Sequence, residues 1–291
     1  MVTIDPAIIE ALGVPLEKCK ISQHGSTGFA QSFKIMTEDD GKEKHYFAKT
    51  GPEGNMFKGE HASLNAIHGT VPNLCPRSLA HGPLKDSDNS FLLTEFIDFN
   101  AQHGDGQSTT SLPQKLATLH STTAPVPLGY DQPMFGFPVT TCCGSTPQDN
   151  GFRSSWAEFF ADNRLRFILN FAEENQGTNK ALRSKMDALI ESVVPRLLGD
   201  GHLGGANNVK PVLVHGDLWS GNKARGIIGG RGAVEDVVFD PSCCYAHSEY
   251  EIGIMKMFGG FSSGFFKEYH KLVPKTVPEQ EYDDRVQLYQ L

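Results

Sequence analysis

The segment VLVHGDLWSGN at 212–222 decides how the rest of the chain is interpreted. It starts with the apolar run 212–214, which is typical of a short buried strand, and continues into a His-Gly-Asp triplet ending at Asp217. Asn222 follows that aspartate by five positions. The carboxylate is suited to accept a proton, and the amide oxygen is suited to bind a hard cation. The segment therefore predicts a catalytic loop at the end of a buried strand.

Composition limits the classes of protein to which the chain can belong. Its 291 residues are enough for one large or two medium domains, and a hydrophobic content of 39% is ordinary for a globular protein. The formal net charge of −8 argues against nucleic-acid binding. No apolar run approaches the roughly 20 residues of a membrane span, and the N-terminus lacks the basic region of a signal peptide. We expect a cytoplasmic protein that binds neither nucleic acid nor membranes.

The six cysteines show no metal-binding or disulfide pattern. Four of them form the adjacent pairs Cys142-Cys143 and Cys243-Cys244, and no C-x-x-C spacing occurs. These features are typical of reduced thiols in an intracellular protein.

Hydrophobic periodicity divides the chain into two parts. Up to residue 97 it predicts a helix from Asp5 to Gly13, an antiparallel hairpin within 19–50, a helix over 56–68 and a strand from residue 90. Beyond it, helical patterns cover 112–120, 156–172, 180–198, 250–271 and 280–291, interrupted by strands at 211–215 and 233–240. We expect an α+β fold with a β-rich N-lobe (1–97), a mainly helical C-lobe (98–291) and a cleft between the two lobes.

The N-terminal part also contains candidates for binding a nucleotide. Small residues between two predicted strands let backbone N–H groups approach phosphate oxygens. Lys49 ends a strand, and Glu60 follows on the next helix, where it can orient the lysine towards phosphates. The backbone of Glu95 and Ile97, on the strand linking the lobes, can pair with the edge of an adenine base. The phosphate loop is predicted at Gly25, Ser26, Thr27 and Gly28.

Asp240 completes the set. It ends the apolar run 237–239 and lies 18 positions beyond Asn222, where protein-kinase-like phosphotransferases place a second metal-binding carboxylate. Each feature alone has an ordinary structural explanation, such as a β-turn or a solvated lysine. Together, in this order, they predict phosphoryl transfer from ATP with Mg²⁺, at an active site in the cleft of a bilobal, protein-kinase-like fold.

Three motifs resemble the fructosamine/ketosamine kinase family, within the larger aminoglycoside-phosphotransferase and choline-kinase group. They are HGDLWSGN at 215–222, FGFPVTTCCGSTPQDN at 135–150, and FDPSCCYAHSEYEIGIMKMFGGF at 239–261. The resemblance implies ATP-dependent phosphorylation of the sugar 3-hydroxyl of ribulosamine or fructosamine adducts, on protein lysines or on small amines. The unstable product would free the amine, so the implied activity is deglycation repair.

The resemblance also implies roles for individual residues. Asp217 would be the general base, Asn222 and Asp240 would bind magnesium, and Lys49 with Glu60 would contact the phosphates. Trp219 either packs on the substrate sugar or supports the packing of the lobe. His215 and His120 are expected to hold the loop rather than to react, and Cys142-Cys143 to pack the C-lobe.

Some alternatives remain open. The sequence also fits a kinase for a small molecule of the aminoglycoside or choline type, or a nucleotide-binding protein without catalysis. Some family members carry a cysteine in the phosphate loop, which allows an intermolecular disulfide; residues 25–31 contain none, so we expect a monomer. The uncapped helical pattern at DRVQLYQL leaves open whether the C-terminus is complete, and the preferred sugar is also open.

Overall fold

The computed structural model describes residues 4–26, 31–39, 41–100, 106, 108–230 and 232–291. The chain forms two compact units, of which the first comprises Met1–Lys115 with Gly221–Pro241 and the second Leu116–Ser220 with Ser242–Leu291. The first unit extends past the expected boundary at residue 97 and takes in a segment that returns from the second. The two-lobe boundaries and the cleft remain predictions.

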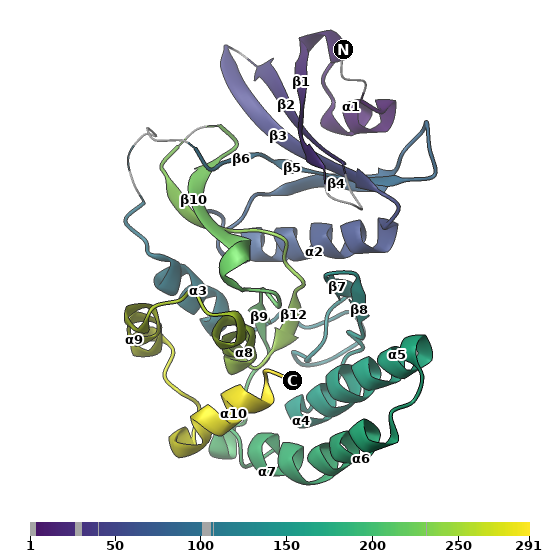
Figure 1. The fold of residues 1–291 in the computed structure, drawn as a ribbon. Helices are drawn as coiled ribbons and strands as arrows, with labels where there is room; N and C mark the ends of the chain where they lie inside the picture. The colour runs from purple at the N-terminus through teal and green to yellow at the C-terminus, as the bar shows by residue number, and fades with distance from the viewer. Residues whose placement is uncertain (1–3, 27–30, 40, 101–105, 107, 231) are drawn as a thin grey trace. The chain divides into compact units, whose positions relative to one another are not determined.

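A five-stranded antiparallel sheet forms most of the first unit (Figure 1). Its strand order is β1-β2-β3-β5-β4, and the register places Phe33 opposite Ala48 and Lys49 opposite Leu92. The elements in chain order are α1 (Pro6–Leu12), a 3-10 turn (Leu16–Lys18), β1 (Cys19–Ser26), β2 (Gln31–Asp39), β3 (Lys42–Gly51), α2 (Gly54–Thr70), β4 (Ser78–Pro83), β5 (Ser90–Glu95) and β6 (Ile97–Asp98).

Two helices pack on this sheet. The Asp5 side chain accepts from the Ala7 N–H at 2.8 Å and caps α1, and Gly13 ends the helix with a φ of 69°, as its sequence predicts. Ile8 joins the buried cluster formed by alternate residues of the strands, which include Phe33, Ile35, Ala48, Phe91 and Leu93. Helix α2 packs along β4 and β5 and buries Phe57, Leu64 and Ile67, which confirms the expected helix and its core positions.

The first unit also contains a second, smaller sheet. Its strands are β6, β10 (Lys223–Ile228) and β11 (Glu235–Val238), in the order β11-β10-β6. Ile228 lies opposite Ile97, so the returning segment pairs with β6, the short strand that follows β5 in the chain. Strand β10 was not predicted, because its short run KARGII lacks a clear alternation of apolar residues.

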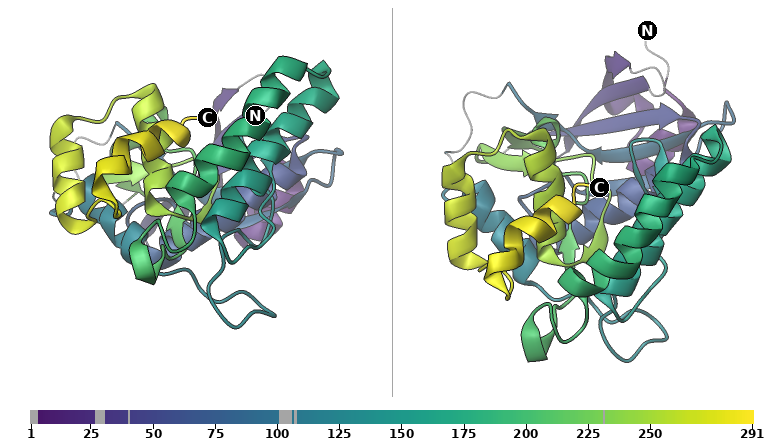
Figure 2. Two further views of the ribbon diagram at one scale, coloured as in Figure 1. Left: turned by 90° about the horizontal axis from the view of Figure 1, so that it is seen from below. Right: turned by 60° about the horizontal axis from the view of Figure 1, so that its bottom comes forward.

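The second unit is mainly helical, as expected. Its elements in chain order are α3 (Leu112–Ser121, which begins in the first unit), β7 (Thr141–Cys143), β8 (Thr146–Gln148), α4 (Trp156–Glu158), a π-helical segment (Phe159–Arg166), α5 (Phe167–Gln176), α6 (Lys180–Ala188), a π-helical turn (Leu189–Val193), α7 (Val194–Leu198), a 3-10 turn (Gly205–Asn207), β9 (Val212–Val214), a 3-10 turn (Ser220–Asn222, which ends in the first unit), β12 (Cys244–Ala246), α8 (Ser248–Phe258), α9 (Ser263–Leu272), a 3-10 turn (Glu279–Glu281) and α10 (Tyr282–Leu288). The run from α4 to α5 lies beside the run from α6 to α7, in teal and green in Figure 2.

The catalytic-loop segment emerges from a two-stranded pairing in this unit. Strand β9 pairs antiparallel with β12, with Val214 opposite Cys244. The predicted strand at 211–215 is therefore present, whereas β12 and the hairpin β7–β8 were missed because each has only three residues. Among the helices formed by described residues, none combines the length and apolar character needed to cross a membrane.

Candidate active site

Lys49 in the first unit is paired with two carboxylates. Strand β3 holds its backbone, and its Nζ donates to Glu60 Oε1 on α2 at 2.8 Å. It also donates to Asp240 Oδ1. The ion pair expected between Lys49 and Glu60 is therefore present, and Asp240 joins it. The three side chains bring one positive and two negative charges into a single cluster.

Burial and these charges change the protonation equilibria of the cluster. Burial alone would lower the pKa of Lys49, but the adjacent Glu60 and Asp240 carboxylates raise it above its ordinary value. Burial raises the pKa of Glu60 to about 7; Lys49 opposes this shift and the Asp240 carboxylate adds to it. The lysine is thus held as a cation, as contact with phosphate oxygens requires.

Asp240 has a special backbone conformation. Its φ of 54° lies in the left-handed region, which non-glycine residues adopt rarely and aspartate more readily than most. The preceding Phe239 N–H donates to the Asn222 carbonyl at 3.1 Å, so the two predicted metal-binding positions are anchored to each other through the backbone. Half-exposed, the Asp240 side chain lies within reach of a ligand.

The donor set of this region fits Mg²⁺ held jointly with a phosphate. Asn222 and Asp240 offer an amide and a carboxylate oxygen, the hard ligands that Mg²⁺ prefers. Among the described residues, no group of three or more His, Cys, Asp or Glu side chains could hold a metal ion by itself. Mg²⁺ commonly takes one or two protein ligands and completes its shell with substrate phosphates and water.

A pocket of about 230 Å³ adjoins the Lys49 cluster within the first unit. Strand residues 94–97 line it, as do Lys49, Glu60 and Asp240. The remaining wall is formed largely by the rings of His24, Phe47, Phe99 and Phe239. A flat aromatic base fits such an apolar wall, with charged groups nearby for its phosphates.

The backbone of the expected adenine-binding strand is partly used by the fold. The Glu95 N–H donates to the Arg77 carbonyl at 3.0 Å. The Glu95 carbonyl accepts from the Thr94 hydroxyl at 2.9 Å, and its second lone pair is suited to meet a base edge. Ile97 lies in β6, opposite Ile228. The sequence did not reveal that the Glu95 N–H is already used, because its partner Arg77 directly precedes β4, a separate strand of the sheet.

The predicted phosphate loop is described only in part. Gly25 and Ser26 are the last residues of β1, and the Ser32 hydroxyl donates to the Gly25 carbonyl at 3.2 Å. Ser32 also lines the pocket. Thr27 and Gly28 lie outside the described residues, so the loop remains a prediction.

The His-Gly-Asp loop of the second unit is held by a buried carboxylate that the sequence did not single out. The backbone N–H groups of His215 and Gly216 donate to Glu251 on α8, the latter at 3.0 Å. His120 Nε2 lies 3.6 Å from Glu251 Oε2. Burial would raise the pKa of Glu251, but its hydrogen bonds and the nearby histidines lower it. The local sequence SEYEIGIM contains Glu249 and Glu251 alike, so it did not single out Glu251 for this role.

The loop also touches the chain that precedes β12. Gly216 has a φ of 80°, and a Cβ there would lie 2.0 Å from the Ser242 carbonyl oxygen, so only glycine fits. The Asp217 N–H donates to His215 Nδ1 at 3.3 Å, and buried His215 thereby shapes the turn. His215 thus shapes the loop directly, whereas His120 lies beside the Glu251 carboxylate that holds the loop.

Trp219 presents its indole at the surface of the second unit. Its side chain is 38% exposed, and that of Phe258, at the end of α8, is 58% exposed. Their ring centroids lie 5.8 Å apart. This exposed aromatic pair, Trp219 with Phe258, is available to pack on a ligand; Phe258 was not predicted as a site residue.

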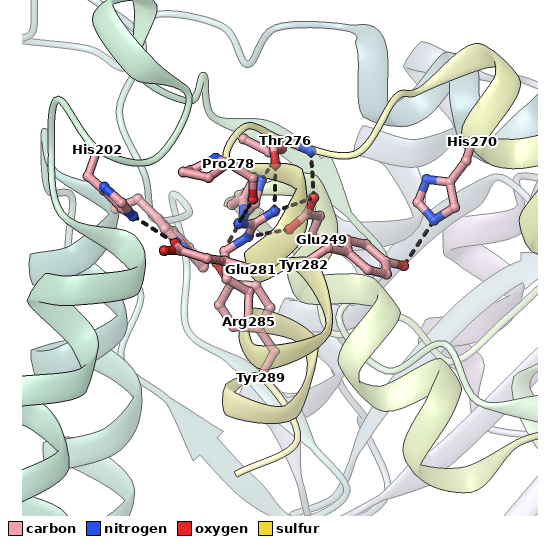
Figure 3. Close-up of polar contacts among 11 residues, drawn as sticks. His202, Glu249, His270, Thr276, Pro278, Glu281, Tyr282, Arg285 and Tyr289 are labelled. Atoms are coloured by element: carbon pink, nitrogen blue, oxygen red, sulfur yellow. Dashed lines mark hydrogen bonds and ion pairs between the residues drawn. The ribbon is translucent and has the colours of Figure 1, made fainter.

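A second ionic network holds α8 itself (Figure 3). Arg285 Nε donates to Glu249 Oε2 at 2.8 Å, and the Thr276 N–H donates to Glu249 Oε1 at 2.7 Å. Arg285 also donates to the carbonyls of Thr276 and Pro278. The C-terminal segment is thereby fastened to the helix that carries Glu251.

Comparisons with known proteins agree on one family. A sequence model described as fructosamine kinase matches residues 3–291. A ketosamine-3-kinase from Mus musculus is 35% identical over 255 residues, which are 81% of this chain and 75% of that protein. A chloroplastic protein-ribulosamine 3-kinase from Arabidopsis thaliana is 34% identical over 252 residues, which are 84% of this chain and 68% of that protein.

Two solved structures share the fold. A candidate fructosamine-3-kinase from Haemophilus somnus superposes with a TM-score of 0.73 at 23% identity, over 98% of this chain and 86% of that one. One from Thermobifida fusca gives 0.74 at 19% identity, over 99% and 90%. The expected α+β architecture is confirmed.

Proposed function

Because the chain belongs to the fructosamine kinase family, a family of phosphotransferases that act on hydroxyl groups, we propose that it is an ATP-dependent ketosamine 3-kinase. Its acceptor is the sugar 3-hydroxyl of a ribulosamine or fructosamine adduct on a lysine or a small amine. The observation that supports this proposal is that Lys49, Glu60 and Asp240 lie together beside a pocket whose aromatic wall can accept a nucleotide base.

The first unit binds the nucleotide. The aromatic pocket receives adenine, and the Glu95 carbonyl accepts from its amino group while the Ile97 N–H donates to its ring. Lys49, oriented by Glu60, neutralises charge on the phosphates. Gly25, Ser26, Thr27 and Gly28 cover them with backbone N–H groups. Asn222 and Asp240 would hold Mg²⁺, which would supply charge neutralisation for the transferring group.

Asp217 in the second unit acts as the general base. As the sugar 3-hydroxyl oxygen attacks the γ-phosphorus, Asp217 accepts the hydroxyl proton, and the bond to the ADP oxygen breaks. The hydrogen bonds that His215 and Gly216 donate to Glu251 fix the backbone before Asp217. The Asp217 carboxylate is thereby positioned without reorganisation. The 3-phosphate then decomposes and frees the amine, which makes the reaction a deglycation.

Trp219 contacts the sugar. The exposed aromatic pair offers a flat apolar surface, and indole faces pack on the apolar faces of sugars. The pair also suits the aliphatic part of a glycated lysine. The cytosolic location and the monomeric state remain predictions.

A substrate panel tests the proposal. Purified protein with ATP and Mg²⁺ is mixed with ribulosyl-lysine and fructosyl-lysine peptides, free ketosamines, choline and an aminoglycoside, and ADP release is measured for each. The 3-phosphate is identified by ³¹P NMR. Turnover confined to ketosamines supports the proposal and ranks the two sugars; preference for choline or the aminoglycoside, or no ADP from any of them, overturns it.

A further inference from the structure

The hairpin β7–β8 is tied to the segment that precedes β12. The Thr141 hydroxyl, fully buried, donates to the Cys243 carbonyl at 3.3 Å. Asn150 Nδ2 donates to Thr141 Oγ1 at 2.9 Å, and buried Arg164 donates to Asn150 Oδ1 at 2.9 Å. These bonds fix the position of the short strand that ends at Cys143.

The catalytic loop is tied to the same segment. The Ser242 N–H donates to the His215 carbonyl at 2.9 Å, and Gly216 packs directly on the Ser242 carbonyl. The hairpin and the loop are therefore anchored to two neighbouring residues of one segment, 242 and 243. The Cys143 thiol donates a hydrogen bond to the Asp217 carboxylate.

We propose that Cys143 is a positioning residue for Asp217: its thiol holds one carboxylate oxygen and directs the other towards the acceptor hydroxyl. The inference rests on the proposed role of Asp217 as base. A general base must present a lone pair within about 3 Å of the proton it takes, and a hydrogen bond to one carboxylate oxygen restricts the rotation of the group. A thiol is a weak donor, so it orients the carboxylate while leaving most of its basicity.

The surroundings keep this thiol protonated. Burial raises the pKa of Cys143 to about 12, and the charge and hydrogen bond of Asp217 add to the shift. A thiol with such a pKa remains a donor throughout the physiological range and is a poor nucleophile. The environment therefore favours a role as donor over one in redox chemistry.

The first test compares kinetics. Cys143→Ala removes the donor and should lower kcat about tenfold with little change in KM for ATP or ketosamine, whereas Cys143→Ser keeps a donor and should recover most of the loss. Cys142→Ala, on the opposite face of β7, is the matched control and should behave as wild type. Thermal unfolding within about 2 °C of wild type shows that each variant is folded.

The second test needs no turnover. Asp217→Asn removes the charge that disfavours the thiolate, so iodoacetamide should alkylate Cys143 at least about threefold faster at alkaline pH, as followed by peptide mass spectrometry. Unchanged labelling, or wild-type kcat in Cys143→Ala, would overturn the inference. If Asp217→Asn is inactive while Cys143→Ala is not, only this inference fails. If Asp217→Asn is itself fully active, the proposed function of Asp217 fails as well.

Discussion

The Glu251 carboxylate accepts the backbone N–H of Gly216 at 3.0 Å and also that of His215, so a single buried side chain holds the loop that leads to Asp217. Carboxylates that accept several N–H groups form strong, charge-assisted hydrogen bonds. The loop geometry therefore depends on helix α8 as well as on the local sequence.

Replacing this carboxylate should disturb stability and activity together. Glu251→Gln substitutes one acceptor oxygen with an NH₂ group that faces two N–H donors, so we expect a loss of about 2–4 kcal/mol in the free energy of unfolding. Turnover should fall by at least about tenfold because the base moves. Urea unfolding and ADP-release assays measure both, with exposed Glu174→Gln as the control. A Glu251→Gln variant with wild-type stability and turnover would show that the loop does not need the Glu251 carboxylate.

Lys49 should matter for nucleotide rather than for ketosamine. Lys49→Met removes the cation that meets the phosphates and leaves Glu60 and Asp240 without their shared partner. We expect kcat/KM for ATP to fall by at least about 100-fold, since one charged contact to the transferring group has that magnitude. Lys58→Met, exposed on the same helix as Glu60, is the control. Equal kcat/KM values for the two variants would contradict the assignment.

Replacing only Arg285 of the buried Arg285–Glu249 pair should lower the free energy of unfolding more than replacing both residues. Arg285→Met leaves the Glu249 carboxylate buried without its cation, and we expect the free energy of unfolding to fall by about 3–5 kcal/mol. The double variant Arg285→Met/Glu249→Gln removes that charge as well and should recover part of the loss. Chemical denaturation of both variants and of exposed Arg196→Met checks this. A double variant less stable than Arg285→Met would argue that the pair is not the main interaction.

His247 should make the fold sensitive to mild acid. Burial lowers its pKa to about 4 from an ordinary 6.5, while Glu249 opposes the shift. Between pH 6.5 and 4, His247 is protonated in the unfolded chain but remains neutral in the folded chain. The stabilisation that comes from keeping His247 neutral is therefore complete above about pH 6.5 and is lost as the pH falls towards 4. The free energy of unfolding should fall by up to about 1.4 kcal/mol per pH unit there.

The His247→Gln variant isolates this contribution. Its free energy of unfolding, measured by urea titration at several pH values, should show a shallower slope between pH 6.5 and 4 than that of the wild type. The two proteins differ only at this position, so the contributions of the other groups cancel in the comparison. Identical slopes would assign the acid sensitivity to other groups.

The sequence predicted those parts of the fold and of the candidate site that depend on local spacing. The cap of α1, the core face of α2 and the ion pair of Lys49 with Glu60 follow from periodicity and from neighbouring elements. Glu251 was missed because it contacts a loop 35 residues away, and nothing local marks one helix carboxylate among many. The three-residue strands β7 and β12 are too short to show a period, so the contact of Cys143 with Asp217 was equally hidden.

Turnover of the Asp217→Asn protein tests the central claim most directly. With ATP, Mg²⁺ and a ribulosyl- or fructosyl-lysine peptide, the wild type should release ADP in step with formation of the 3-phosphate. The variant should lose at least about 100-fold of that rate, since general-base catalysis contributes about 10²–10⁴, while it still binds ATP in calorimetry. Wild-type turnover by Asp217→Asn would contradict the account.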